Sequence, residues 1–474
     1  MFCGYQEISL RPAHLVGCGT DMAAVEFPPG RQQCGRDFAI SDEKETRMGT
    51  ITSKPPSPPP ATEGFWLSQL SPKEKSTLIA TFGGWALDGM DVMVYSFVIP
   101  SLIAAWHISK SDAGWLGTAA LLMSSLGGWL AGLLADRFGR VRVLQITIVW
   151  FAVFTFLSGF TQGFWQLLLC RGLQGLGFGG EWAVGSVLMG EAIRAQYRGR
   201  AVGTVQGGWA IGWGIAAFSY MVLLSKLPGN WGWRAMFWIG ILPAFLVFYI
   251  RQKVEEPEVY SKTRDTVEKR HETHFMEIFS PAVLKVTLWT SLLAIGVQGG
   301  YYAITTWLPT FLKTVRKLSV MNTGGYLFVV IVGSFLGYMI SAYLADALGR
   351  KKTLIIYAVC SFVTVWAYTY LPISNSVMLV LGFPLGFFAS GAFSPIGAFF
   401  TELFPSRVRG SGQGFSYNVG RAIGALFPTL VGYLSKTLAL GHAIAIFAVS
   451  AYLVMIVAVV ALPETRGKEL KVYE

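Results

Sequence analysis

The sequence predicts an all-α membrane protein with twelve transmembrane helices arranged as two pseudo-symmetric six-helix bundles. Its composition is the first observation, with 53% hydrophobic and only 14% charged residues and a mean hydropathy of +0.49. Soluble domains carry about 25% charged residues. Twelve apolar stretches, each close to the ~20 residues that a spanning helix needs, are the second observation. Loop motifs that recur between the two halves of the chain are the third.

Residues 1–75 differ from the rest of the chain. They contain the proline-rich run PPSPPP at residues 55–60 and mixed charge at residues 37–47. They carry no apolar run long enough for a signal peptide or a span. We therefore expect residues 1–75 to be disordered and cytoplasmic. Met48 is a candidate start, in which case residues 1–47 are not translated.

The remaining chain divides at its longest, highly charged connection. Residues 76–251 are expected to form one six-helix bundle and residues 284–463 the other, with a cytoplasmic linker at 252–283 and a cytoplasmic tail at 464–474. The expected spans are 77–104, 113–134, 141–160, 164–189, 199–225, 233–251, 284–312, 323–345, 352–371, 375–400, 410–435 and 441–462.

The net charge of +11 is explained by the short connections between spans. Lys and Arg gather in the loops on the side of the N-terminus and are sparse in the loops on the other side. By the positive-inside rule both termini are cytoplasmic, and the protein is expected in the bacterial inner membrane. The basic charge is therefore a topology signal, and nucleic acid is not expected as a partner.

The two halves share loop motifs at a nearly constant offset. DRFGRVR at Asp136–Arg142 recurs as DALGRKK at Asp346–Lys352, and 346 − 136 = 210. Glu191, between the fourth and fifth spans, recurs as Glu402, and 402 − 191 = 211. A duplicated unit of this kind predicts a substrate site between the halves, near the middle of the membrane.

The first of these motifs resembles the loop signature of the major facilitator superfamily. The resemblance covers residues 77–470 and implies the twelve-helix fold of that superfamily. It also implies that the motif acts as a cytoplasmic gate, a latch that forms in one access state and opens in the other. Ala342 and Ala347 replace a Gly and an Arg in the second copy, whose charge relay should be weaker. The gate residues are Gly132, Asp136, Arg137, Gly139, Arg140, Arg142, Asp346, Gly349 and Arg350.

Two acids lie within the first span, in the sequence GGWALDGMDVMVYSFVIPSL. Burying an acid at membrane depth is costly, so such residues usually mark an ion or proton pathway. Asp88 and Asp91 are spaced i, i+3, share one helical face and are expected to look into the same cavity. We expect proton coupling at Asp91, Asp88 or Glu181 of the fourth span. The alternative is that one acid caps a break at Gly89 or pairs with a neighbouring helix.

Four segments carry a narrower resemblance. Asp88, Gly89 and Asp91 resemble the D-G-x-D of aromatic acid:proton symporters and of bacterial sialic acid transporters, and SYNVGRAIGALFP at residues 416–428 resembles the aromatic acid group. CRGLQGLGFGGEW at 170–182 and WGWRAMFWIGILP at 231–243 are similar to the sialate:proton symporter family, which includes lactate-type carriers. Glu181 departs from the aromatic acid pattern and favours the sialate family. The resemblance implies proton-coupled uptake of a small organic anion, a monocarboxylate or sialate, with an aromatic acid as the alternative.

The charged residues within the spans point to an anion site. Arg421 is the only embedded charge in the spans of the second half, so it is expected to face water or to bind an anionic substrate. The planar fork of Arg holds a carboxylate through two parallel hydrogen bonds. The alternative role of Arg421 is an ion pair with Asp88 or Asp91 that gates the cavity. Arg171 has acids in its own half and is expected to pair with one of them, with substrate binding as its second role.

Three further side chains are candidates for substrate binding. Trp209 of the fifth span and Tyr301 of the seventh lie in spans that tend to line cavities, although packing is the common role of such residues. Gln298 is a candidate for hydrogen bonding to the substrate or between helices. The glycines of the fourth span, Gly172 to Gly180, resemble a phosphate loop, but no Lys-Ser/Thr pair follows them, and we interpret them as helix-packing residues.

Other function classes explain less of the sequence. A membrane enzyme would account for the embedded acids alone, and no nucleophile with a base or His/Cys cluster occurs in the spans. A membrane sensor of the same fold would usually carry a long cytoplasmic domain. The five cysteines show no metal-ligand spacing, so neither a metal nor a cofactor is expected. We expect a monomeric transporter, not an enzyme, whose partners are protons, a small organic anion and the lipid bilayer.

Overall fold

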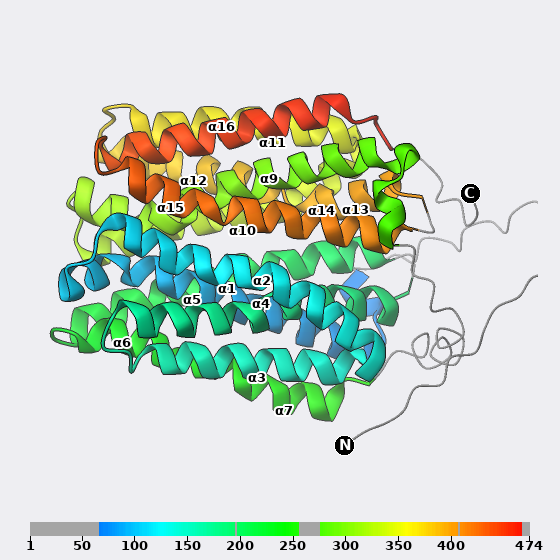
Figure 1. The fold of residues 1–474 in the computed structure, drawn as a ribbon, viewed down its shortest axis with the longest axis horizontal. Helices are drawn as coiled ribbons and strands as arrows, with labels where there is room; N and C mark the ends of the chain where they lie inside the picture. The colour runs from blue at the N-terminus through cyan, green and yellow to red at the C-terminus, as the bar shows by residue number, and fades with distance from the viewer. Residues whose placement is uncertain (1–65, 195–196, 256–274, 406–407, 467–474) are drawn as a thin grey trace, which may run out of the picture. The chain divides into compact units, whose positions relative to one another are not determined.

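The computed structural model of the chain describes residues 66–194, 197–255, 275–405 and 408–466. In this part of the chain all regular secondary structure is helical. The helices lie side by side, with the first half in blue to green and the second in green to red (Figure 1).

Both halves contain six helical rods within the described residues. The first half holds α1 (Pro72–Trp106), α2 (Lys110–Phe138), α3 (Arg140–Ser158), α4 (Phe164–Ala192), α5 (Arg198–Lys226), and α6 (Trp231–Trp238) continued through η3 (Ile239–Ile241) into α7 (Leu242–Lys253). The second holds α9 (Pro281–Thr310) with η5 (Phe311–Val315), α10 (Val320–Leu348), α11 (Arg350–Tyr370), α12 (Asn375–Gly391) with α13 (Ser394–Leu403), α14 (Arg409–Gly424) with α15 (Leu426–Leu434), and α16 (Leu440–Ala461). These twelve rods coincide with the twelve expected spans.

Eight of the described helices are long and apolar enough to cross a membrane by length and composition alone. The remaining rods are α2, α4, α6–α7 and α14–α15. Of these, α4 holds Arg171 and Glu181, and α14 holds Arg421.

Glycines let the helices of each half approach closely. In the first half, a Cβ added at Gly179 of α4 would lie 1.7 Å from the carbonyl oxygen of Ser124 of α2. In the second half, a Cβ at Gly386 of α12 would lie 1.9 Å from the carbonyl oxygen of Val330 of α10. Neither position tolerates a side chain. The interpretation of the glycines in the fourth span as packing residues is confirmed at Gly179, and the second half uses the same device.

The expectation that residues 1–75 are disordered is wrong for the last ten of them. Trp66–Gln69 form a 3-10 helix (η1), and α1 begins at Pro72. Ser71 and Glu74 form a capping box, and Glu74 also pairs with Arg194 at 2.9 Å. These bonds satisfy the N–H groups of the first turn of α1, so the helix begins before the apolar run does. Residues 1–65, including the candidate start at Met48, lie outside the described residues.

The expected linker and tail are also ordered at their edges. α7 ends at Lys253, η4 covers Phe275–Phe279 and α9 begins at Pro281, so both ends of the predicted linker 252–283 belong to helices. Residues 256–274 lie outside the described part. The tail is described to Arg466, and its first residue, Glu464, is anchored by hydrogen bonds to the start of α11.

The two halves contact each other along their length. We call the end that holds Gly139 and Gly349 the motif end, and the opposite end the far end. At the far end a Cβ on Gly114 would lie 2.6 Å from the Cα of Thr429, and Thr118 bonds Thr429 at 2.8 Å, so the halves are closed against each other there. They also meet nearer the motif end, where a Cβ on Gly203 of α5 would lie 3.5 Å from the Cβ of Ala342 of α10.

Candidate functional site

A cavity lies between the two halves, where the duplicated architecture predicts a substrate site. The space between its lining atoms is about 340 Å³ with open solvent included, of which a water-sized molecule can occupy only about 20 Å³ in this conformation. Eight of its ten lining residues are aromatic. The first half contributes Trp85, Phe178, Gln206 and Trp209, and the second contributes Tyr301, Tyr302, Tyr338, Phe393, Tyr417 and Arg421.

Arg421 places a cation in this aromatic cavity. It is 1% exposed, and its guanidinium lies 5.2 Å from the ring centroid of Phe178 in the other half and 5.2 Å from that of Tyr417 on its own helix. Among the described residues its Nε has no hydrogen-bond partner, and no ion pair joins it to Asp88 or Asp91. The predicted gating ion pair is therefore not formed in this conformation. Aromatic faces and the Tyr417 side chain hold the guanidinium, while Asp88 acts on its charge from beyond ion-pair distance.

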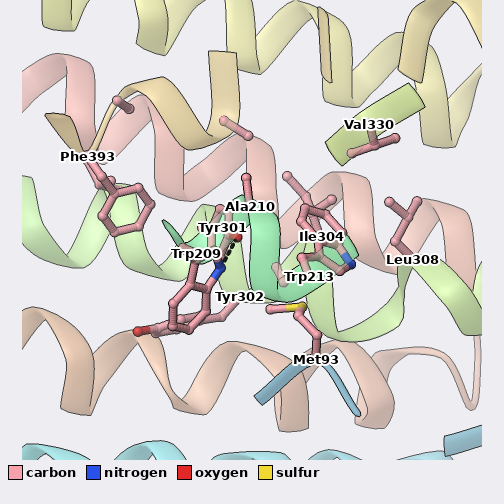
Figure 2. Packing of buried hydrophobic residues seen from close by; sticks show 14 of the residues in the cluster. Met93, Trp209, Ala210, Trp213, Tyr301, Tyr302, Ile304, Leu308, Val330 and Phe393 are labelled. Atoms are coloured by element: carbon pink, nitrogen blue, oxygen red, sulfur yellow. Dashed lines mark hydrogen bonds between the residues drawn. The ribbon is translucent and has the colours of Figure 1, made fainter. Parts of the chain in front are cut away.

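Trp209 and Tyr301 line the cavity and bind each other across it. The indole N–H of Trp209 on α5 donates to the hydroxyl of Tyr301 on α9, with 2.7 Å between the heavy atoms (Figure 2). Trp85 packs on Trp209, with 5.0 Å between ring centroids, and Phe393 packs edge-on against Tyr301 at 5.2 Å. The sequence placed both residues near the substrate, and the structure shows that they also tie one half to the other.

Gln298 lies behind the cavity wall rather than in it. Its amide nitrogen donates to the carbonyl oxygen of Tyr417 at 2.9 Å, and its amide oxygen accepts from the hydroxyl of Tyr302 at 3.1 Å. These bonds join α9 to α14 and orient two tyrosines that do line the cavity. Of the two roles predicted for Gln298, hydrogen bonding between helices is the one formed in this conformation, and substrate binding stays a prediction.

The sequence analysis missed Gln206, which lines the cavity from α5. Its side chain is 8% exposed and forms no hydrogen bond to a described residue. The signal in the sequence was its spacing from Trp209, three residues later and therefore on the same helical face.

Asp88 and Glu181 bring two carboxyl groups together outside the cavity. Asp88 on α1 is 0% exposed and Glu181 on α4 is 2% exposed, and their carboxyl groups are close enough to act on each other electrostatically. Among the described residues, neither carboxyl oxygen of Asp88 has a hydrogen-bond partner. Gly84 makes room for Glu181, since a Cβ there would lie 2.3 Å from Oε1 of Glu181. Two buried acids this close disfavour ionisation of both at once.

Asp91 belongs to a second polar cluster, farther along α1. It accepts a hydrogen bond from the amide of Gln174 on α4, whose oxygen accepts from Arg171. The guanidinium of Arg171 also lies 4.6 Å from the ring centroid of Tyr95. Arg171 is thus linked to an acid of its own half, through one intervening amide.

The expectation that Asp88 and Asp91 look into one cavity is wrong. They do share a helical face, but that face packs against α4 rather than facing the cavity. α1 and α4 run antiparallel, so Asp91 meets Gln174 while Asp88 meets Glu181, two turns later on α4. Neither acid is among the cavity lining residues. The periodicity of one helix fixes which residues share a face but not what that face meets.

Comparison with known proteins identifies the family. The sequence matches the Major Facilitator Superfamily over residues 81–374 and again over residues 326–473. The chain belongs to this superfamily. It is thus a multi-pass integral membrane protein of a transporter family, and the predicted fold is confirmed.

Its relatives include transporters of several organic acids. The chain is 42% identical to a probable 4-methylmuconolactone transporter of Cupriavidus pinatubonensis over 85% of this chain and 93% of the relative. It is 29% identical to the cis,cis-muconate transport protein of Acinetobacter baylyi over 76% and 88% of the two chains, and 27% identical to the sialic acid transporter NanX of Escherichia coli over 83% and 95%. The resemblance to transporters of both kinds is confirmed.

Solved structures show the same fold. The inward open xylose transporter XylE of Escherichia coli matches with a TM-score of 0.67 and 20% identity, over 83% of this chain and 97% of that one.

The two copies of the superfamily loop motif turn in the same way. Gly139 has φ 103° and Gly349 has φ 104°, and each both ends one helix and begins the next. Residues with a Cβ rarely adopt this conformation, so the motif requires Gly at both places. In the first copy, Arg142 is exposed and Arg140 is half-buried. The side chains of Asp136, Arg137 and Asp346 lie outside the described part of the structure.

The second copy of the motif is held in a network of charged groups. Nη2 of Arg350 pairs with Glu402 of α13 at 3.0 Å, and Glu402 also accepts from the hydroxyl of Thr465. The carboxylate of Glu464 accepts from the backbone N–H groups of Arg350 at 2.9 Å and Lys351 at 3.1 Å. The second loop thus joins α11, α13 and the end of α16. Glu402, which the sequence repeat singled out, is part of the same network.

Proposed function

We propose that this superfamily member is a proton-coupled symporter that takes up a small organic anion, and that Arg421 binds the carboxylate of that anion. One observation carries the proposal: a guanidinium is buried at the interface of the halves, within an aromatic cavity, and no ion pair joins it to an acid among the described residues. A buried unpaired cation is expensive, and a carboxylate that comes and goes would offset that cost. Opening of the two ends of the bundle in turn would give the anion access to Arg421 from each side of the membrane.

Among organic anions, the cavity favours ring or conjugated acids over sialate, which was the first expectation. Eight aromatic side chains offer faces and edges for stacking with a planar ligand. A polyhydroxylated sugar acid would need many hydrogen-bonding groups, and this lining has few with capacity to spare. The relatives named for muconate and methylmuconolactone transport support the same choice, since both compounds are compact unsaturated acids.

Proton coupling is assigned to the first half. Asp88, Glu181 and Asp91 are the candidates, and the burial of Asp88 beside Glu181 supports this pair as the place where a proton is held, because two neighbouring buried acids do not both ionise readily. Asp91, favoured from its depth in the span, is instead committed to the cluster with Gln174 and Arg171. At about 2.3 kcal/mol per charge per 100 mV, the membrane potential drives uptake of a monoanion only if at least two protons accompany it.

The remaining assignments follow from the sequence. We propose that residues 76–251 and 284–463 form the two bundles, that both termini are cytoplasmic, and that the transporter works as a monomer in the inner membrane. The motif end then faces the cytoplasm, and the closed far end faces outward.

Uptake into proteoliposomes tests the function. Purified protein is reconstituted, an inward proton gradient is imposed, and labelled benzoate, 4-hydroxybenzoate, cis,cis-muconate, lactate and sialate are supplied separately. We expect accumulation of at least one ring or conjugated acid, abolished by a protonophore. Empty liposomes and the variant R421K are the controls. Accumulation of none of the acids, or equal accumulation without a gradient, would overturn the proposal.

A further inference from the structure

Gln206 is a buried polar side chain without a hydrogen-bond partner among the described residues. Its amide lines the cavity and is 8% exposed. Other buried amides of the spans are fully engaged: Gln174 bridges Asp91 and Arg171, and Gln298 bridges two tyrosines. Leaving a buried amide unpaired costs stability, so an unpaired one that faces a cavity indicates a group that binds there.

Most hydrogen-bonding groups of the other lining residues already have partners. Trp209 and Tyr301 bind each other, and the hydroxyl of Tyr302 donates to Gln298. Tyr338 has Ser390 and Tyr301 as its hydrogen-bonding neighbours. Within the described lining, Gln206 is the amide and Arg421 the cation, and each has a group that can still bind a polar ligand atom.

These two groups come from different halves. Gln206 lies on α5 of the first half, one helical turn before Trp209, and Arg421 lies on α14 of the second half. Both line the same cavity. A compact ligand that enters when the cavity opens can contact both of them and thereby contact both halves at once.

We propose that Gln206 determines specificity by binding a second polar group of the ring acid whose carboxylate Arg421 holds. This inference rests on the proposed function. A primary amide both donates and accepts hydrogen bonds, so the complementary group is a ring hydroxyl, a ring carbonyl or a ring nitrogen. The preferred substrates are therefore ring acids that carry such a group, and the unsubstituted ring acid leaves the amide unpaired.

Binding of a matched pair of acids to purified full-length protein tests the proposal. The probes are benzoate and its 3-hydroxy and 4-hydroxy derivatives, which differ in one hydroxyl and its position, measured by calorimetry. One neutral hydrogen bond is worth about threefold to tenfold in affinity, so the wild type should bind at least one hydroxybenzoate that much more tightly than benzoate. In Q206L this preference should vanish while the affinity for benzoate stays within about twofold.

Two further variants separate the possible outcomes. Q145L removes an amide of α3 that does not line the cavity, and should leave the preference for the hydroxylated acid in place. R421K should weaken benzoate and hydroxybenzoate alike. If the wild type shows no preference, or if Q206L weakens all three acids equally, the role of Gln206 is refuted while the proposed function stands. If R421K binds all three acids like the wild type, the proposed function fails, and a wild type that binds none of them refutes both.

Discussion

The two halves share one fold but hold their buried charges differently. In the first half, Asp91 and Arg171 are linked through an amide, and Asp88 lies against Glu181. In the second half, Arg421 is surrounded by aromatic rings and, among the described residues, is not joined to any acid by an ion pair. Under the proposed function, the buried acids of the first half hold the proton and the arginine of the second half binds the anion. The two halves therefore repeat the same helical scaffold but carry different buried charged groups.

The largest effect is expected from replacing a carboxyl group of the first half, Asp88 or Glu181, by an amide. D88N and E181Q should abolish accumulation driven by a pH gradient while leaving exchange of labelled for unlabelled substrate, because an amide cannot release a proton at this position. Uptake and exchange in proteoliposomes are the two measurements. Full pH-driven accumulation in both variants would move the proton site to Asp91.

Two adjacent glycines provide a matched test of the same pair. G84A places a methyl group 2.3 Å from the original position of Oε1 of Glu181 and should impair proton coupling by displacing that carboxyl group. G83A meets only side-chain atoms of Leu246 at 3.5 Å or more and should transport like the wild type. Equal behaviour of the two variants would show that the carboxyl contact does not matter for coupling.

Replacing the guanidinium of Arg421 in the second half should have the next largest effect. R421K keeps the charge but loses the bidentate geometry and the stacking on Phe178, so binding of the carboxylate should weaken by about 10-fold to 100-fold. Thermal unfolding should stay close to that of the wild type. Unchanged affinity with slower turnover would instead assign Arg421 to a gate.

Loss of the hydrogen bond between Trp209 and Tyr301, which joins the halves, should have a smaller effect. W209F and Y301F each remove the same hydrogen bond, so each should change the transport rate about threefold to tenfold, and the double variant should add little to either. W213F is the control, because its indole N–H has no partner among the described residues. If Y301F weakens substrate binding and W209F does not, Tyr301 is a substrate ligand rather than a link between halves.

The helices could be predicted from the sequence because hydropathy acts locally. Each of the twelve expected spans overlaps one described rod, and Gly139 and Gly349 adopt the backbone that the repeated motif requires. The absence of an ion pair to Arg421 within its own half could also be predicted, because the expected spans of that half contain no acid. The capping box is also visible in the sequence, as a Ser at 71 followed three residues later by Glu74, but it precedes the apolar run by which the span was predicted.

The partners of polar side chains could not be predicted in the same way. Gln206 and Gln298 are chemically identical, yet one faces the cavity and the other joins two helices. Likewise Asp88 and Asp91 share a face, but only the packing of α1 on α4 separates their partners. Which residues meet across helices depends on rotation and register between the helices, and these are set by contacts such as those of Gly84 and Gly179.

The smallest expected effect concerns Glu464, at the motif end of the second half. Its partial burial raises the pKa of the carboxyl group, but the backbone N–H groups of Thr465, Arg466, Arg350 and Lys351 lower it, and the net pKa is below the ordinary 4.5. The carboxylate therefore stabilises the folded protein at neutral pH, and this contribution is lost as the pH falls below 4.5 and through the lowered pKa.

Glu464→Gln should lower the free energy of unfolding by about 0.5 kcal/mol at pH 7, a fraction of a capping interaction because the side chain is exposed. The difference from the wild type should shrink as the pH falls, measured as thermal unfolding in detergent between pH 7 and pH 3.5. Glu255→Gln is the control, since its pair with Lys73 is exposed to solvent and contributes little. A difference that grows toward acid pH would mean that the protonated form of Glu464, rather than its carboxylate, stabilises the loop.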